Sequence, residues 1–178
     1  MDAVTLSKNE FLLDDASYFE DKKDLYWCIK RDISRTLSVD VSDIRICGSA
    51  YWGLRFVDET PFQPGSSDLD VAIINPSMFC RCMTEVRELT KNFNDQSVFP
   101  QCGNEVNSFD LFRGYAFGKG IIMIHHLPDI QIRRDLIDAS QSISKRYLDH
   151  FEKITFSIYD SAISFAVKQA QATKKFRG

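Results

Sequence analysis

Short apolar runs and longer amphipathic stretches alternate along this chain of 178 residues. Residues 15–37 carry apolar side chains near helical spacing, with Asp15 as a possible cap, which predicts a long helix starting at residue 14 or 15. Residues 1–13 are expected to form a partly ordered arm. The apolar run at 44–47 predicts a strand, and residues 49–56 predict the helix that follows it.

A second strand is predicted at residues 68–74, where polar and apolar side chains alternate before an apolar run. Asn75-Pro76-Ser77 ends that run, and the apolar stripe over 78–93 predicts a helix that packs on the sheet. Residues 94–107 are polar and irregular. Residues 108–116 fit a strand or a short helix.

The last part of the chain predicts a hairpin and a long helix. Residues 121–126 are expected to be a buried strand, and 129–134 alternate as the second arm after Leu127-Pro128. Residues 140–176 contain neither Gly nor Pro and have apolar residues at threes and fours, which predicts one helix that bends, splits near 155–157 or packs on a second chain.

These elements predict an α/β (α+β) fold with a short mixed β-sheet, flanking helices and a helical C-terminal segment. The expected organisation is one domain, with a core and N-terminal helix over 1–138 and a helical segment over 139–178 packed on that core or on a partner. The length allows a sizeable buried core.

Composition excludes some classes of protein. The chain has no run of eighteen apolar residues and no basic stretch followed by an apolar one at its start, so we expect no membrane span, no secretion signal and a cytoplasmic location. Five cysteines without a metal-like spacing are expected to be reduced thiols. A net charge of -3 argues against coating nucleic acid by charge alone. Seven Lys/Arg against three acids from Ala139 onward suit a polyanionic ligand such as a nucleotide.

Asp68 and Asp70 are the leading candidates for chemistry. A strand places both carboxylates on one face with Leu69 opposite. Two like charges this close are costly unless a cation neutralises them, which favours a hard divalent ion, Mg²⁺ or Mn²⁺. Mg²⁺ takes one or two carboxylates together with the phosphates of a nucleotide. The alternative is a pair of surface acids at the start of a strand.

Gly48 and Ser49 supply a complementary feature. A glycine after a strand lets the backbone turn and lets a phosphate approach without meeting a side chain. The N–H groups of the following helix would point at that phosphate. For Ser49, the alternative role is a helix cap.

The order Gly48-Ser49, three residues, Gly53, then Ser67-Asp68-Leu69-Asp70 and an apolar run resembles the signature of the nucleotidyltransferase superfamily. That superfamily has the fold of DNA polymerase beta and includes aminoglycoside nucleotidyltransferases and minimal nucleotidyltransferases of toxin-antitoxin pairs. The resemblance covers roughly residues 44–74, with weaker support to about residue 135. Nineteen residues separate Gly48 from Asp68, more than compact members carry, and the excess is expected in an exposed loop at 55–65.

The resemblance implies a nucleotidyltransferase fold and a set of site residues. Gly48, Ser49 and Ser67 would contact the nucleotide, and Asp68 and Asp70 would hold the metal that bridges its triphosphate. Members of the family generally add a third carboxylate from a neighbouring strand, which would share the metal or act as general base. Asp129 fits that role best, Asp110 competes with it, and the absence of a third acid is the remaining alternative.

The implied function is transfer of a nucleoside monophosphate from an NTP to a hydroxyl acceptor, with release of pyrophosphate. The acceptor would be an RNA end, a protein side chain or a small molecule. One alternative is synthesis of a cyclic or alarmone-type nucleotide, because residues 129–133 also resemble the acid-x-Gln-x-Arg strand of alarmone synthetases. The other is an inactive nucleotidyltransferase-fold protein that binds or regulates, with the C-terminal helix contacting a partner protein or a second copy.

Several other residues have both a chemical and a structural interpretation, and the structural one is favoured for each. Basic residues near the end of the chain could clamp phosphate, two histidines could act in catalysis, and two aromatic residues could stack on a base: Arg133, Arg134, Lys145, Arg146, His125, His126, Tyr51 and Trp52.

Overall fold

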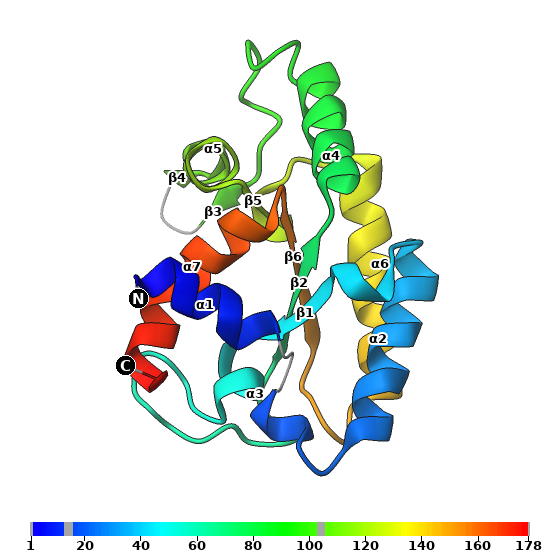
Figure 1. Cartoon of the computed structure of the whole chain (residues 1–178). Coiled ribbons are helices and arrows are strands. Elements are labelled where there is room, and N and C mark those ends of the chain that lie inside the picture. The colour runs from blue at the N-terminus through cyan, green and yellow to red at the C-terminus, as the bar shows by residue number, and fades with distance from the viewer. Residues whose placement is uncertain (1, 13–15, 103–105, 178) are drawn as a thin grey trace.

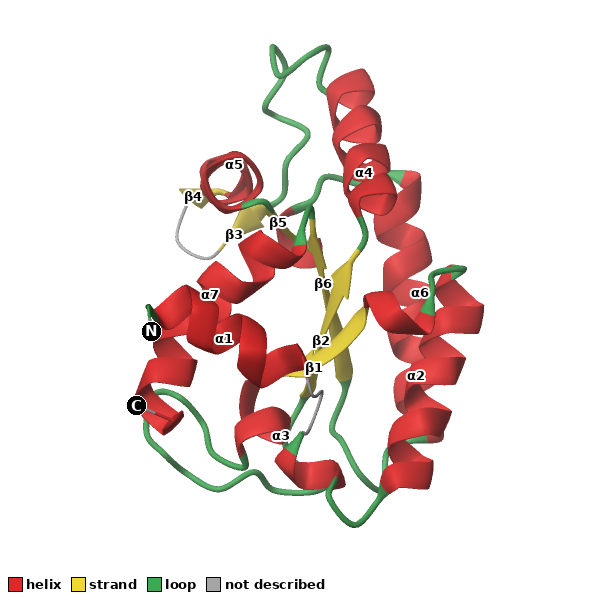
Figure 2. Cartoon of the chain, in the orientation of Figure 1, coloured by secondary structure: helices red, strands yellow, loops and turns green. Residues whose placement is uncertain are grey.

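A four-stranded mixed sheet forms the centre of the computed structural model, which describes residues 2–12, 16–102 and 106–177 (Figures 1 and 2). The predicted α/β class with a short mixed sheet is confirmed. Along the sheet the order is β1 (Ile44–Cys47), β2 (Leu69–Ile74), β6 (Ile154–Tyr159) and β5 (Ile121–Met123). β2 and β6 are parallel, and the other neighbours are antiparallel. β3 (Gln101–Cys102) and β4 (Val106–Asn107) form a separate pair.

Helices cover both faces of this sheet (Figure 1). α1 (Ala3–Leu12) and α7 (Ala162–Arg177) lie on one face, and α2 (Lys23–Leu37) and α6 (Gln131–Arg146) lie on the other. The remaining helical elements are α3 (Gly48–Trp52), α4 (Pro76–Leu89), α5 (Ser108–Lys119) and the 3-10 turns η1 (Ser17–Phe19), η2 (Val41–Asp43) and η3 (Ile124–His126). No helix within the described ranges is both long and apolar enough to cross a membrane.

The N-terminal arm that we expected over residues 1–13 is the helix α1 in its described part. Asp2 caps it, because its Oδ1 accepts hydrogen bonds from Val4 N and Thr5 N, each at 3.0 Å. Phe11 then fixes the helix to the body, since its ring stacks on Tyr51 with 4.1 Å between ring centres. The predicted Asp15 cap of the next helix lies outside the described residues, and α2 begins at Lys23.

The strand and hairpin predicted at 129–134 are wrong, because α6 begins at Gln131. Five alternating residues cannot by themselves separate a strand from the first turn of a helix. The longer pattern decides, since Ile132, Leu136, Ala139 and Ile143 recur at helical spacing and are all buried. As a result β5 pairs with β6 and not with residues 129–134.

The stretch predicted as helical over 140–176 splits around residues 155–157, which was one of the alternatives, but the break is a strand and residues 139–178 are therefore not wholly helical. β6 interrupts the helical pattern and lies in the middle of the sheet, between β2 and β5. Along its six residues, apolar side chains alternate with side chains that carry a hydroxyl group. The hydroxyl of Ser140 donates to Ile154 O at 2.5 Å, and Ile154 N donates to the Ser144 hydroxyl at 2.8 Å, so α6 anchors the start of the strand.

The strands predicted at 44–47 and 68–74 and the helix predicted at 78–93 are confirmed with adjusted bounds, whereas the predicted strand at 121–126 ends at Met123 and the predicted helix at 49–56 ends at Trp52. β1 and β2 form where apolar runs predicted them. Asn75 caps α4, because its side-chain oxygen accepts from Met78 N at 2.8 Å, and Pro76 is the first residue of the helix. The ambiguous stretch that begins at residue 108 is the helix α5.

His126 gives the first testable prediction, because it is buried at the end of η3, the turn after β5, with only 6% of its surface exposed. Burial, and next the neighbouring His125, lower the pKa of His126 from 6.5 to about 4. The unfolded chain therefore binds a proton more readily than the folded chain below pH 6.5. Stability is full above that pH and is expected to fall by up to about 3 kcal/mol as the pH approaches 4.

Urea unfolding of the wild type and of His126→Phe between pH 7.5 and pH 4.5 checks this expectation. The phenyl ring keeps the packing against Tyr115, whose ring centre lies 5.6 Å from that of His126. The variant should lose less stability on acidification than the wild type. An equal loss in both proteins would rule out His126 as the source.

Candidate functional site

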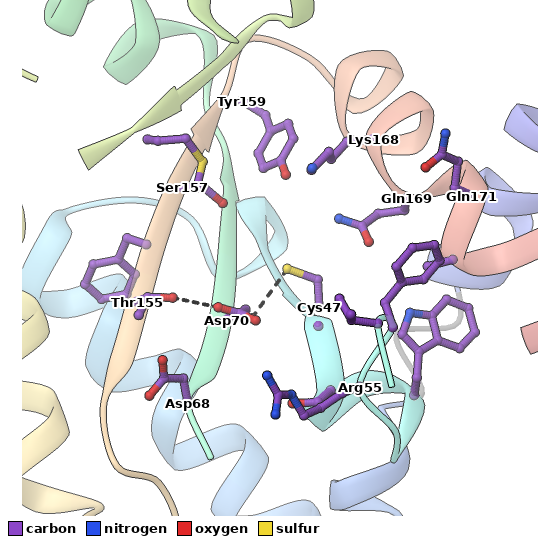
Figure 3. A pocket seen from close by; sticks show the side chains of 18 of the residues that line it. Cys47, Arg55, Asp68, Asp70, Thr155, Ser157, Tyr159, Lys168, Gln169 and Gln171 are labelled. Carbon is purple, nitrogen blue, oxygen red and sulfur yellow. Dashed lines mark hydrogen bonds between the residues drawn. The ribbon is translucent and has the colours of Figure 1, made fainter. Parts of the chain in front are cut away.

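A cavity of about 630 Å³ lies on the α7 side of the sheet (Figure 3). Its walls come from β1, α3, the loop after α3, β2, β5, η3, β6 and α7. That volume is in the range of pockets that take small ligands. Gly48, Ser49, Asp68 and Asp70, four of the predicted site residues, all line it.

Asp70 lies at the centre of this pocket (Figure 3). Its Oδ1 accepts a hydrogen bond of 2.8 Å from the hydroxyl of Thr155, its register partner on β6. The thiol of Cys47 donates to the backbone oxygen of Asp70 at 3.5 Å. Burial raises the pKa of Asp70, the Thr155 hydrogen bond opposes that shift, and the nearby charge of Asp68 adds to it. The ionised form is therefore costly here, and a bound cation would relieve that cost.

Asp68 lies two residues earlier and projects toward the same pocket (Figure 3), as the period of a strand requires. Its Oδ2 is 3.2 Å from Lys153 Nζ, and its side chain is 34% exposed. Leu69 between the two acids is fully buried on the other face. The guanidinium of Arg55 lies across the pocket from Thr155 (Figure 3).

Gly48 is pressed against Asp70. Its φ of +66° lies in the left-handed region, and a Cβ at this position would overlap Asp70 Oδ2. Gly48 begins α3, a short helix of five residues that ends at Trp52, and the N–H of the next residue, Gly53, donates to Ser49 O at 2.8 Å. The predicted glycine turn and the predicted acid pair thus meet, and the turn requires a residue without a side chain.

Neither candidate for a third acid reaches this pair. Asp129 precedes α6, where its side chain is 70% exposed and 2.9 Å from Arg134. Asp110 is in α5, where its side chain is 67% exposed and 3.0 Å from Arg113. The strand expected to carry Asp129 beside Asp70 does not form, and β6 presents Thr155 there instead. Within the described part of the chain, no three His, Cys, Asp or Glu side chains form a metal-holding group.

Ser67, the remaining predicted contact of the nucleotide, has a structural role. Its hydroxyl accepts from Gln63 N at 3.0 Å, and its N donates to Gln63 O at 2.9 Å, which closes a turn before β2. Its backbone oxygen accepts from Glu152 N at 3.1 Å. Ser67 therefore positions the start of the strand that carries the acids.

The basic residues predicted as possible phosphate clamps, Arg133, Arg134, Lys145 and Arg146, belong to α6 on the opposite face of the sheet. The basic side chains that do line the pocket are Arg55, Lys153 and Lys168. His125 also lines it, whereas Tyr51 is part of the core. Trp52 lines the pocket and packs against Phe176, with 5.3 Å between ring centres.

Sequence reasoning missed a whole wall of the pocket, formed by β6 and α7. Thr155, Ser157 and Tyr159 alternate along β6 and face the cavity, while Lys168 and Gln169 reach it from α7 (Figure 3). Burial raises the pKa of Tyr159 far above its usual value, and the Cys47 side chain adds to the shift, while hydrogen bonds with Ser157 and Gln169 oppose it. The alternation from Ile154 to Tyr159 was the signal that could have identified this strand.

Comparisons of the chain with family models, with curated proteins and with solved structures find no match. Any assignment of function therefore depends on the residues of this pocket.

Proposed function

We propose that this protein has the nucleotidyltransferase fold, binds an NTP with Mg²⁺ in this pocket and transfers the nucleoside monophosphate to a hydroxyl acceptor. One observation carries the proposal: the ionisable carboxylate of Asp70 is partly buried and lies against Gly48 in a cavity that Asp68 also lines. Burying a carboxylate in this way costs free energy, so it favours a role that depends on the charge.

The donor set fits a divalent ion held jointly by protein and substrate. Two carboxylates, Asp68 and Asp70, are what Mg²⁺ takes from a protein when phosphates and water complete its coordination. When bound, such an ion would neutralise phosphate charge and lower the pKa of the acceptor hydroxyl. Mn²⁺ has the same preference for oxygen ligands and would serve as a probe.

The residues of the chain have separable roles in this proposal. Asp68 and Asp70 hold the ion, and the Thr155 hydroxyl orients Asp70 through its 2.8 Å hydrogen bond. Gly48 has no side chain that would occupy the space beside the Asp70 carboxylate. Lys168 and Arg55, which line the same cavity, provide positive charge for phosphate oxygens.

A second candidate function is nucleotide binding without transfer. It is favoured by Thr155, a neutral side chain that occupies the register position beside Asp70 where a third carboxylate was expected. With fewer negative ligands the metal would be held more weakly, and among the described residues that line the cavity only the pair itself offers a carboxylate to accept the proton of the acceptor.

Incubation with each labelled NTP and Mg²⁺, with and without total RNA, tests both candidates. Label transferred to RNA, to protein or to a small hydroxyl compound supports transfer, and a new small nucleotide supports the signalling-nucleotide alternative. Binding without any product supports the second candidate. Asp70→Ala should remove each signal, and failure to bind any NTP would contradict all three.

Thr155→Asp is expected to strengthen metal binding by at least about tenfold, because a third carboxylate joins the pair at Asp70. In the absence of metal the same variant should melt below the wild type, since three like charges repel. Thermal melting across a MgCl₂ titration measures both effects. Thr155→Asn has the same shape without the charge, and an equal Mg²⁺ response of the two variants would contradict a metal site here.

A further inference from the structure

A short hairpin between α3 and β2 forms one wall of the pocket. Arg55 N donates to Thr60 O at 2.9 Å, and Phe62 N donates to Gly53 O at 2.8 Å, so residues 53–62 fold back on themselves. Leu54 and Pro61 form a β-bridge inside this segment. The loop predicted to be exposed at 55–65 is exposed at every residue except Phe62, and its first part is ordered as this hairpin.

The last turns of α7 hold this hairpin in place. Lys175 Nζ donates to Phe56 O at 2.7 Å and lies 2.8 Å from Glu59 Oε1. The Lys175 ammonium is 5.1 Å from the centre of the Phe56 ring, and the centres of the Phe56 and Phe176 rings are 6.4 Å apart. The backbone at Phe56 is thus fixed by a charged hydrogen bond, although the residue lies at the surface.

The hairpin presents apolar side chains to a pocket that also contains two acids and three basic residues. Phe56 is 45% exposed and Val57 is 85% exposed, and both line the cavity. A ligand that covers this exposed apolar surface removes it from water, and that burial contributes favourable free energy to binding. An aromatic ring in addition favours a flat aromatic ligand that stacks on it.

We infer that Phe56 stacks on the base of the bound nucleotide, an inference that rests on the proposed function. A nucleoside triphosphate combines one flat aromatic group with one polyanionic tail. The same cavity combines an exposed ring at Phe56 with Asp68, Asp70 and Lys168. Every base has a π-face, so this contact strengthens nucleotide binding without choosing among the bases.

Calorimetric titration of the full chain tests this contact with three Mg²⁺ complexes: non-hydrolysable ATP, non-hydrolysable UTP and inorganic tripolyphosphate. Phe56→Ala and Phe56→Leu should each weaken binding of both nucleotides about tenfold and leave tripolyphosphate binding unchanged. Phe56→Trp should bind all three as the wild type does. Phe117→Ala is the matched control, because Phe117 is an exposed aromatic residue on α5 that does not line the pocket.

Two results would contradict the stacking inference and leave the proposed function intact. In the first, Phe56→Ala binds both nucleotides as tightly as the wild type. In the second, Phe56→Ala loses affinity for tripolyphosphate and for both nucleotides equally, which indicates that the hairpin has collapsed. Wild-type protein that binds neither nucleotides nor tripolyphosphate would instead contradict the proposed function, and the stacking inference with it.

Discussion

Asp70→Asn is expected to stabilise the protein against heat while it reduces nucleotide transfer by at least about a thousandfold. The pKa of Asp70 is raised in the fold, chiefly by burial, so this carboxyl lowers stability as the pH rises above its ordinary pKa of 3.8, and the loss is complete once the pH exceeds the raised pKa. Asparagine removes the buried charge and keeps an oxygen that accepts the Thr155 hydrogen bond. The loss of activity follows because a metal ligand contributes several kcal/mol to transition-state stabilisation, and each 1.36 kcal/mol is tenfold in rate.

Thermal melting at pH 7.5, with and without Mg²⁺ and a non-hydrolysable NTP, measures both sides of this prediction. The wild type should gain stability from the ligand through mass action, and Asp70→Asn should melt higher alone and gain nothing. Asp110→Asn is the control, since it makes the same chemical change at an exposed carboxylate outside the pocket. A variant that melts lower than the wild type without ligand would contradict the cost assigned to the buried charge.

Gly48→Ala is expected to lower both stability and activity. The left-handed conformation at φ +66° costs a residue with a Cβ about 1–2 kcal/mol, and overlap with the Asp70 carboxylate adds to that cost. Because Asp70 must shift to make room, transfer and metal binding should fall as well. Urea unfolding gives the stability change, and the labelled-NTP assay gives the activity change.

Two comparisons isolate the cause of this effect. Gly114→Ala, at an exposed position inside α5 where a Cβ meets nothing within 4 Å, should stabilise by about 0.5–1 kcal/mol. In an Asp70→Ala background the carboxylate overlap is gone, so Gly48→Ala should cost less than it does in the wild type. Additive losses in the double variant would contradict a direct conflict between Gly48 and Asp70.

Local patterns were sufficient to predict the part of the site that lies on β1, α3 and β2. Each of these elements is short, and its signal is carried by adjacent residues: an apolar run before Gly48, and an alternation that places Asp68 and Asp70 together. The cap and proline that begin α4 are equally local. For these elements, packing in the sheet favours the same conformation as the local sequence does.

The other wall of the pocket is not predicted by local patterns alone, because the alternation from Ile154 to Tyr159 competes with a helical spacing of the same residues. Ile154 and Ile158 are spaced for a helix as well as for a strand, and the parallel pairing with β2 decides in favour of the strand. The start of α6 also fits two periods, because residues 129–133 alternate as in a strand while Ile132, Leu136 and Ala139 have the spacing of a helix. The strand predicted over 129–134 is what makes Asp129 the preferred third acid, ahead of Asp110, and that preference fails with the strand.

A crystal structure of the protein with Mn²⁺ and a non-hydrolysable NTP tests the central claim most directly. The proposal predicts anomalous density for the ion within about 2.1–2.2 Å of carboxylate oxygens of both Asp68 and Asp70, with the triphosphate bound to the same ion. An ion and a nucleotide bound elsewhere on the molecule, with Asp70 still paired only with Thr155, would contradict it.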